Sequence, residues 1–87
     1  MVYKILFTSS ARKGLKSVPK KDQRRILGVI EKLATNPRPE GVKVLQGVEG
    51  LLRLRVGNYR IVYQVKDEVL EVLIIRIGDR KDVYRKL

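Results

Sequence analysis

The chain contains neither cysteine nor histidine, and these two absences exclude several kinds of functional site. Without cysteine there is no disulfide framework and no thiolate metal site. Without histidine, the chain lacks the commonest general base and the commonest metal ligand of proteins. Chemistry at a site therefore falls to Lys, Arg, Tyr, Asp or Glu, and we expect neither a metal nor another cofactor.

Long hydrophobic runs are also missing. The first residues, 1–7, lack the extended apolar region of a signal peptide. No apolar run approaches the roughly 20 residues of a membrane-spanning helix. No amphipathic segment with aromatic residues is evident that would anchor the chain to an anionic membrane. We therefore expect a cytoplasmic protein without a membrane partner.

Acidic residues are scarce: nine Asp and Glu stand against 20 Lys and Arg, which gives a net charge of +11 on 87 residues. A field of this kind attracts polyanions and speeds their encounter with the protein. Apolar residues make up 44% of the chain, an ordinary share for a globular domain. The charge therefore belongs to a folded body, and a nucleic acid is the expected partner. A merely solubilising surface is the alternative.

The hydrophobic pattern predicts a single α+β domain over residues 1–87. The order is β-α-α-β-β-β, with a two-helix hairpin on one face of an antiparallel meander and the first strand beside the last. Thr8 and the serines after it offer N-cap oxygens for the first helix, and Pro19 separates the helices. An apolar stripe on the second helix comprises Ile26, Leu27, Ile30 and Leu33. The expected strands are at 2–7, 51–56, 59–65 and 69–77. The first helix is expected to run from a cap within 8–10 to about 18, and the second from about 20 or 21 to 34. A short extended piece is expected at 42–45 and a polar tail at 82–87.

The pair Gly57-Asn58 predicts a two-residue hairpin turn, which fixes the pairing of the strands around it. Directly opposed residues share a face of the sheet. The apolar face, expected against the helices, collects Leu52, Leu54, Val56, Ile61 and Tyr63. The other face collects Arg53, Arg55, Arg60, Val62 and Gln64.

This pairing places Arg55 directly opposite Arg60. Opposed like charges destabilise a sheet, so the arrangement favours a purpose other than stability. A bridging phosphate would offset the repulsion, because guanidinium groups bind phosphate in a bidentate manner. The alternative is a set of solvated arginines, paired in part with Glu71 of the next strand.

The end of the chain carries further candidates. Arg80 follows Gly78-Asp79, and Tyr84 lies four residues later. If Gly78 turns the chain back over the open face, both side chains reach the arginine cluster. The alternative for Tyr84 is a half-buried aromatic that holds the tail on the sheet.

Residues 52–63, Leu-Arg-Leu-Arg-Val-Gly-Asn-Tyr-Arg-Ile-Val-Tyr, resemble the arginine-rich hairpin of the RelE/ParE toxin superfamily. Residues 78–85, Gly-Asp-Arg-Lys-Asp-Val-Tyr-Arg, resemble the C-terminal signature of the RelE branch. The resemblance covers nearly the whole chain. It implies a toxin of a toxin–antitoxin pair that cleaves messenger RNA, often in the ribosomal A site, by attack of a 2′-hydroxyl on the adjacent phosphodiester.

The resemblance also implies roles for individual residues. Arg53 would bind phosphate or assist the attack, and Arg60 would contact the scissile phosphate. Arg80 would stabilise the developing negative charge, and Tyr84 would stack on a base or transfer a proton. We expect RNA contacts as well from Lys43, Arg55, Lys66, Lys81 and Arg85.

Two positions depart from the family pattern: Leu51 stands where some members have a basic residue, and Asp79 where many have histidine. The implied partners are an antitoxin encoded by the adjacent gene and the ribosome with its message. The alternative functions are a ParE-like toxin that acts on DNA gyrase without nuclease activity, and a nucleic-acid-binding module without toxicity. The Tyr84 ending favours the RelE branch over the ParE branch.

Overall fold

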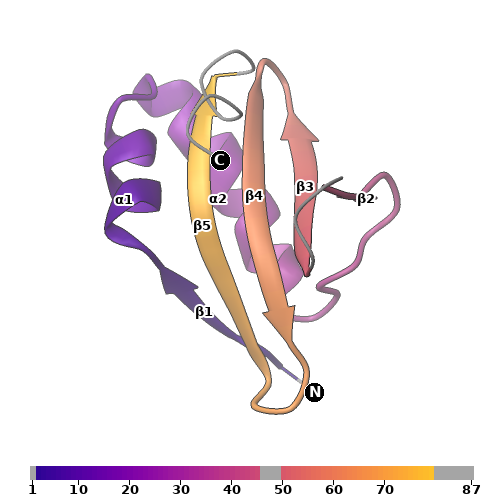
Figure 1. The fold of residues 1–87 in the computed structure, drawn as a ribbon. Helices are drawn as coiled ribbons and strands as arrows, with labels where there is room; N and C mark the ends of the chain where they lie inside the picture. Colours follow the sequence, from indigo (N-terminus) through magenta and orange to yellow (C-terminus); the bar gives the residue numbers. More distant parts are fainter. Residues whose placement is uncertain (1, 46–49, 80–87) are drawn as a thin grey trace.

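The computed structural model describes residues 2–45 and 50–79, which form a five-stranded sheet with two helices (Figure 1). The strand order is β1-β5-β4-β3-β2, with β1 parallel to β5 and the other neighbours antiparallel. The predicted α+β order is therefore confirmed, including the place of the first strand beside the last. The elements are β1 (Lys4–Phe7), α1 (Ser9–Lys16), α2 (Lys20–Leu33), β2 (Lys43–Val44), β3 (Leu51–Val56), β4 (Tyr59–Lys66) and β5 (Glu71–Asp79).

Thr8 begins α1 and ties it to the sheet. Its Oγ1 accepts a hydrogen bond from the backbone N–H of Ala11 at 3.0 Å and donates one to the carbonyl oxygen of Ile75 at 2.6 Å. The predicted N-cap is confirmed, since a threonine oxygen satisfies an N–H of the first turn. The helix ends at Lys16, two residues earlier than predicted, because a residue that precedes a proline disfavours helical geometry and Val18 precedes Pro19.

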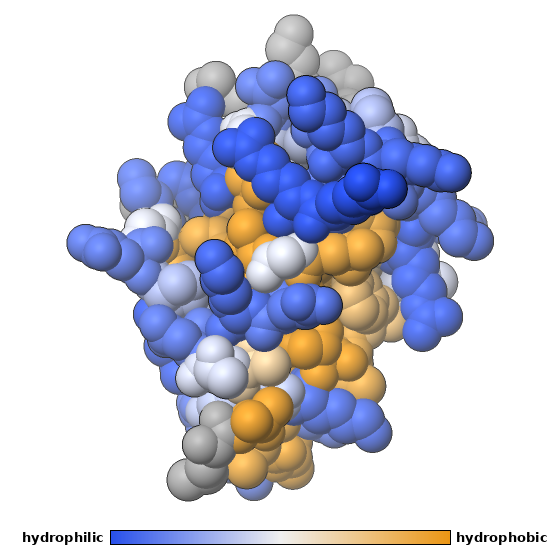
Figure 2. Space-filling model, turned by 180° about the vertical axis from the view of Figure 1, so that it is seen from behind, coloured by the Kyte–Doolittle hydropathy of each residue, from blue (hydrophilic) through white to orange (hydrophobic). Residues whose placement is uncertain are grey.

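The main core lies between α2, α1 and one face of the sheet. Ile26, Ile30 and Leu33 of α2 are buried against it, but Leu27 is 38% exposed. Leu27 was wrongly placed in the buried stripe. One residue turns the helix by about 100°, which carries Leu27 away from the sheet. Figure 2, which views this side of the molecule, shows hydrophobic surface that remains uncovered among the charged side chains.

The last strand begins and ends two residues later than predicted. Residues 67–70 form a turn in which the N–H of Leu70 donates to the carbonyl of Asp67, and Leu70 has a φ of 54°. Val69 lies in this turn and is 60% exposed, so it does not begin the strand. Gly78 does not turn the chain back, the condition under which Arg80 and Tyr84 would reach the arginines, because it continues β5 opposite Arg60.

Gly14 allows α1 to approach the backbone of β5. A Cβ atom at this position would lie 1.9 Å from the carbonyl oxygen of Ile77. Gly28 on α2 has no neighbouring atom within 4 Å of the corresponding point. The close packing of α1 on β5 therefore requires glycine at position 14, whereas no neighbouring atom requires glycine at position 28.

Replacement of these glycines by alanine is expected to have opposite effects. Gly14→Ala forces α1 away from β5 and should lower the free energy of unfolding by about 1–3 kcal/mol or more, as overpacking does. Gly28→Ala should raise it by about 0.5–1 kcal/mol, because alanine loses less backbone entropy in a helix. Urea unfolding of both variants provides the comparison. Equal effects of one sign would contradict the close contact at Gly14.

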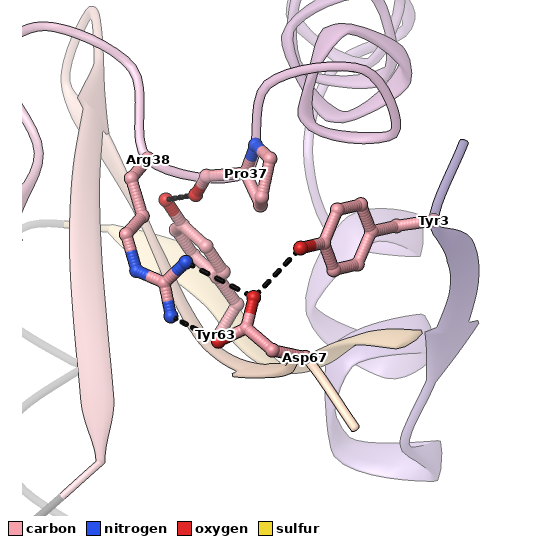
Figure 3. Close-up of polar contacts among 5 residues, drawn as sticks. All are labelled: Tyr3, Pro37, Arg38, Tyr63 and Asp67. Atoms are coloured by element: carbon pink, nitrogen blue, oxygen red, sulfur yellow. Dashed lines mark hydrogen bonds and ion pairs between the residues drawn. The ribbon is translucent and has the colours of Figure 1, made fainter. Parts of the chain in front are cut away.

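A polar network joins the N-terminus, the loop after α2 and the β4–β5 turn (Figure 3). Asp67 accepts hydrogen bonds from the Tyr3 hydroxyl at 2.6 Å and from Arg38 at 2.8 and 3.2 Å. Arg38, followed by Tyr3, lowers the pKa of Asp67 from 3.8 to about 2. Because this pKa is lower in the folded state than in the unfolded state, the ionised network stabilises the fold at pH values above the ordinary carboxyl pKa. That stabilisation is lost as the pH falls through the folded-state pKa.

The contribution of Asp67 should therefore depend on pH. Asp67→Asn is expected to be less stable than the unchanged protein at pH 6, and the gap should close as the pH falls from about 4 toward 2. Thermal unfolding at several pH values measures the gap. A difference that stays constant over this range would show that ionisation of Asp67 does not contribute.

Candidate nucleic-acid interface

The β3–β4 hairpin has the predicted register. Gly57 takes a φ of 60° in the turn, Arg55 pairs with Arg60, and Leu54 pairs with Ile61. Leu54 and Ile61 belong to the main core. The arginines alternate with these core residues and therefore belong to the opposite, open face, which is turned toward the viewer in Figure 1 with α2 behind it.

The open face carries a pocket of about 180 Å³. It is lined by Gly41, Lys43, Arg53, Arg55 and Arg60. On this measure a single water molecule needs only about 10–15 Å³, so the pocket has room for a phosphodiester group. The structure thus brings together four of the predicted site residues, all of them cationic.

Two like-charged pairs surround this pocket. Arg55 lies directly opposite Arg60, and Lys43 of β2 lies directly opposite Arg53 of β3. Opposed like charges repel each other, and an anion between them would turn that repulsion into attraction. The electrostatics therefore favour a bound polyanion.

A small second core lies beside these cations. Leu45, Leu51 and Val62 are buried there, with Ile75 packed against them. Leu51, where the resemblance led us to expect a basic residue, supplies apolar packing at this place. Apolar surroundings lower the local dielectric and strengthen the attraction between a cation and a bound phosphate.

A β-bulge in β5 adds a residue that the sequence analysis missed. The register between β4 and β5 shifts between Val62 and Tyr63, so that Arg76 lies opposite Val62. The Nε atom of Arg76 is buried and has no hydrogen-bond partner within the described residues. Val62 belongs to the small second core and pairs with Arg53 on its other side. The register therefore places Arg76, Val62 and Arg53 side by side across three strands.

Glu71 lies far from the arginines. It pairs with Lys66, which is six residues from Arg60 along β4. At about 3.3 Å per residue this separation is about 20 Å. The suggested pairing of Glu71 with the arginines is therefore wrong, and Lys66 is not part of the pocket.

The described tyrosines do not offer a phenolate base. Burial raises the pKa of Tyr63 to about 12, and burial, followed by Asp22 and Asp79, raises the pKa of Tyr59. The hydrogen bond to Asp67 is the main cause that raises the pKa of Tyr3. All three therefore keep their protons at neutral pH.

Some predicted residues lie outside the described part of the chain, and their roles stay predictions: Arg80, Lys81, Tyr84 and Arg85.

Within the described residues, no group of three or more Asp and Glu side chains is arranged to hold a metal ion. Neither helix described in the structure has the length and apolar character needed to cross a membrane.

The family model for the ParE toxin of the type II toxin–antitoxin system parDE matches residues 5–84. The chain belongs to the RelE/ParE family of toxins. Toxin RelG of Mycobacterium tuberculosis is 32% identical over 99% of this chain and 100% of its own length. A putative RelE-like toxin protein of Escherichia coli is 32% identical over 97% of this chain and 92% of its own length.

Solved structures agree with the RelE-type assignment. The toxin–antitoxin complex RelBE2 from Mycobacterium tuberculosis contains a chain with a TM-score of 0.81 and 27% identity, covering 92% of this chain and 100% of that one. A chain of the archaeal RelE–RelB complex from Pyrococcus horikoshii has a TM-score of 0.81 and 30% identity, covering 94% of this chain and 99% of that one. The predicted RelE-type toxin fold is confirmed.

Neutralisation of one arginine in this toxin should separate stability from anion binding. Arg55→Met removes the repulsion with Arg60, so the free energy of unfolding should stay unchanged or rise by about 0.2–1 kcal/mol. The rise in melting temperature on addition of phosphate should shrink in the same variant. Differential scanning fluorimetry measures both effects. A destabilised variant with an undiminished response to phosphate would contradict an anion site between these residues.

Proposed function

We propose that this toxin is an endoribonuclease that cleaves messenger RNA in the A site of the translating ribosome, in the cytoplasm. The observation that supports this most strongly is the pocket formed by Lys43, Arg53, Arg55 and Arg60. It presents guanidinium groups, which fit phosphate, on the open face of a toxin of the RelE type.

The reaction begins when a ribose 2′-hydroxyl attacks the neighbouring phosphorus. The 2′-hydroxyl gives up its proton as the bond between O2′ and phosphorus forms, the bond from phosphorus to O5′ breaks, and the leaving O5′ takes up a proton. The products carry a 2′,3′-cyclic phosphate or, after hydrolysis, a 3′-phosphate, and a 5′-hydroxyl. Negative charge grows on the phosphorane oxygens, and preorganised cations stabilise that charge more than they stabilise the substrate.

The cations of the pocket have distinct places in this scheme. Arg60 contacts the scissile phosphate, while Arg53 binds the same group and favours the attack. Arg55 and Lys43 hold the neighbouring backbone. Arg80 adds positive charge where the phosphorane forms.

Proton transfer falls to Tyr84 in this proposal. The three described tyrosines have raised pKa values and keep their protons. Tyrosine ordinarily has a pKa of about 10, and nearby arginines favour its phenolate. Arg80 is close to Tyr84 in sequence and would serve this purpose. Tyr84 also stacks on a base of the message, which orients the sugar for attack.

A cognate antitoxin is the second partner of this toxin. The similar structures are a toxin–antitoxin complex from Mycobacterium tuberculosis and a RelE–RelB complex from Pyrococcus horikoshii. We expect the adjacent gene to encode this antitoxin, with an acidic or amphipathic segment that covers the basic surface. Because the attraction is electrostatic, the affinity should fall as salt concentration rises.

The cleavage proposal is tested on ribosomes that carry a defined message. Incubation with the toxin should produce new message ends within the A-site codon, mapped by primer extension. Arg60→Met should lower the rate tens- to thousands-fold, as loss of a transition-state donor does. Lys32→Met, which removes an exposed charge on α2, is the matched control and should cleave normally. Intact message at saturating toxin would refute the proposal.

A second candidate function is poisoning of DNA gyrase, because the matching family model is that of the ParE toxin. Tyr84→Phe separates the two functions. It should abolish growth arrest if cleavage causes toxicity, and it should leave arrest intact if gyrase is the target. A supercoiling assay with purified gyrase gives the complementary answer, since an endoribonuclease should leave it unaffected.

A further inference from the structure

One side of the cationic pocket is formed by Lys43, whose strand has few contacts with the rest of the sheet. Lys43 belongs to β2, an edge strand of two residues, and both residues of β2 are exposed. Its position opposite Arg53 sets like charges against each other. A short edge strand under such repulsion needs support from elsewhere to keep Lys43 at the pocket.

That support is a pair of contacts in the loop that precedes β2 (Figure 3). The buried hydroxyl of Tyr63 donates a hydrogen bond to the carbonyl oxygen of Pro37 at 2.7 Å. The next residue, Arg38, forms a two-pronged ion pair with Asp67, whose other contact is the hydroxyl of Tyr3. The loop is therefore fixed to β4 and to the β4–β5 turn at two consecutive positions.

The chain between this anchor and the pocket is short and stiff. Pro37 and Pro39 restrict the backbone, since the ring of proline fixes φ. The N–H of Val42 donates to the carbonyl of Pro39 at 3.2 Å and closes a turn. Gly41, with a φ of 91°, completes this turn and lines the pocket itself. A shift of Pro37 or Arg38 would therefore carry Gly41 and Lys43 with it.

We propose that Tyr63, Arg38 and Asp67 are positioning residues that hold Lys43 in the cationic pocket and thereby set its affinity for RNA. This inference rests on the proposed function, because it assigns the pocket to RNA. The residues of the anchor do not touch the RNA. They act on it through the loop and the edge strand.

Neutralising Asp67 distinguishes the positioning role from a simple effect of net charge, because the two predict opposite changes in RNA affinity. Asp67→Asn removes one negative charge and raises the net charge from +11 to +12. If charge alone governed the affinity, this variant would bind RNA more tightly. The positioning role predicts the opposite result. Glu68→Gln makes the same charge change at the neighbouring exposed residue, which is outside the network, and is the matched control.

The first measurement is the affinity for a short RNA made non-cleavable by a 2′-deoxy substitution. Asp67→Asn and Tyr63→Phe should bind roughly three- to tenfold more weakly, the size of couplings between interacting residues. Glu68→Gln should bind as tightly as the unchanged protein or slightly more tightly. Combined with Lys43→Met, Asp67→Asn should cause little further loss, because both changes remove the same contact. Additive losses, or an affinity for Asp67→Asn equal to that of the control, would overturn the proposal.

The second measurement does not depend on RNA. The N–H of Leu45, which follows β2, donates to the carbonyl of Leu51 at 3.0 Å. Hydrogen exchange at this amide should speed up in Asp67→Asn and Tyr63→Phe but not in Glu68→Gln. If the unchanged protein fails to bind the short RNA, the assignment of the pocket to RNA is wrong, whereas exchange still tests the anchor. Unaltered exchange in both anchor variants would overturn the positioning role by itself.

Discussion

Repulsion between opposed cations is the constraint around which the open face is organised. The Arg55–Arg60 and Lys43–Arg53 pairs lie side by side across three strands. The sheet holds them together because the other face of β3 and β4 is buried in the main core, and a smaller apolar cluster packs beside the cations. The free energy gained by burying these apolar residues offsets the repulsion and holds the positive charges together in the free protein. In the proposed function, a phosphate would then meet a preorganised site, which is what transition-state stabilisation requires.

The bulge in β5 matters for the same face. With regular pairing from the β4–β5 turn onward, Arg76 would face Ile61 in the main core. The extra residue places Ile77 opposite Ile61 and moves Arg76 opposite Val62. A charged side chain is thereby removed from the core, where it would be costly, and aligned with the cationic face. Bulges occur often beside functional sites, where they redirect a side chain.

The features that could be predicted from the sequence depend on local chemistry. A two-residue turn at Gly57-Asn58 fixes a register, and strand alternation then assigns each residue of the hairpin to a face. The bulge could not be predicted, because no turn residue marks it. The distance of Lys66 from the pocket could not be predicted, because it depends on how far β4 extends past Arg60. The anchor could not be predicted either, because it joins Tyr63 to Pro37 across 26 positions of the chain. The roles of Arg80 and Tyr84 rest on the family resemblance and stay predictions.

In the proposed function, the open-face cations bind the phosphates of RNA. The most direct test is a crystal structure of the toxin with an RNA made non-cleavable by a 2′-deoxy substitution. A phosphate should lie in the pocket, within hydrogen-bond distance of Arg53 and Arg60. RNA bound to the helix side of the molecule, with the pocket empty of phosphate, would contradict it.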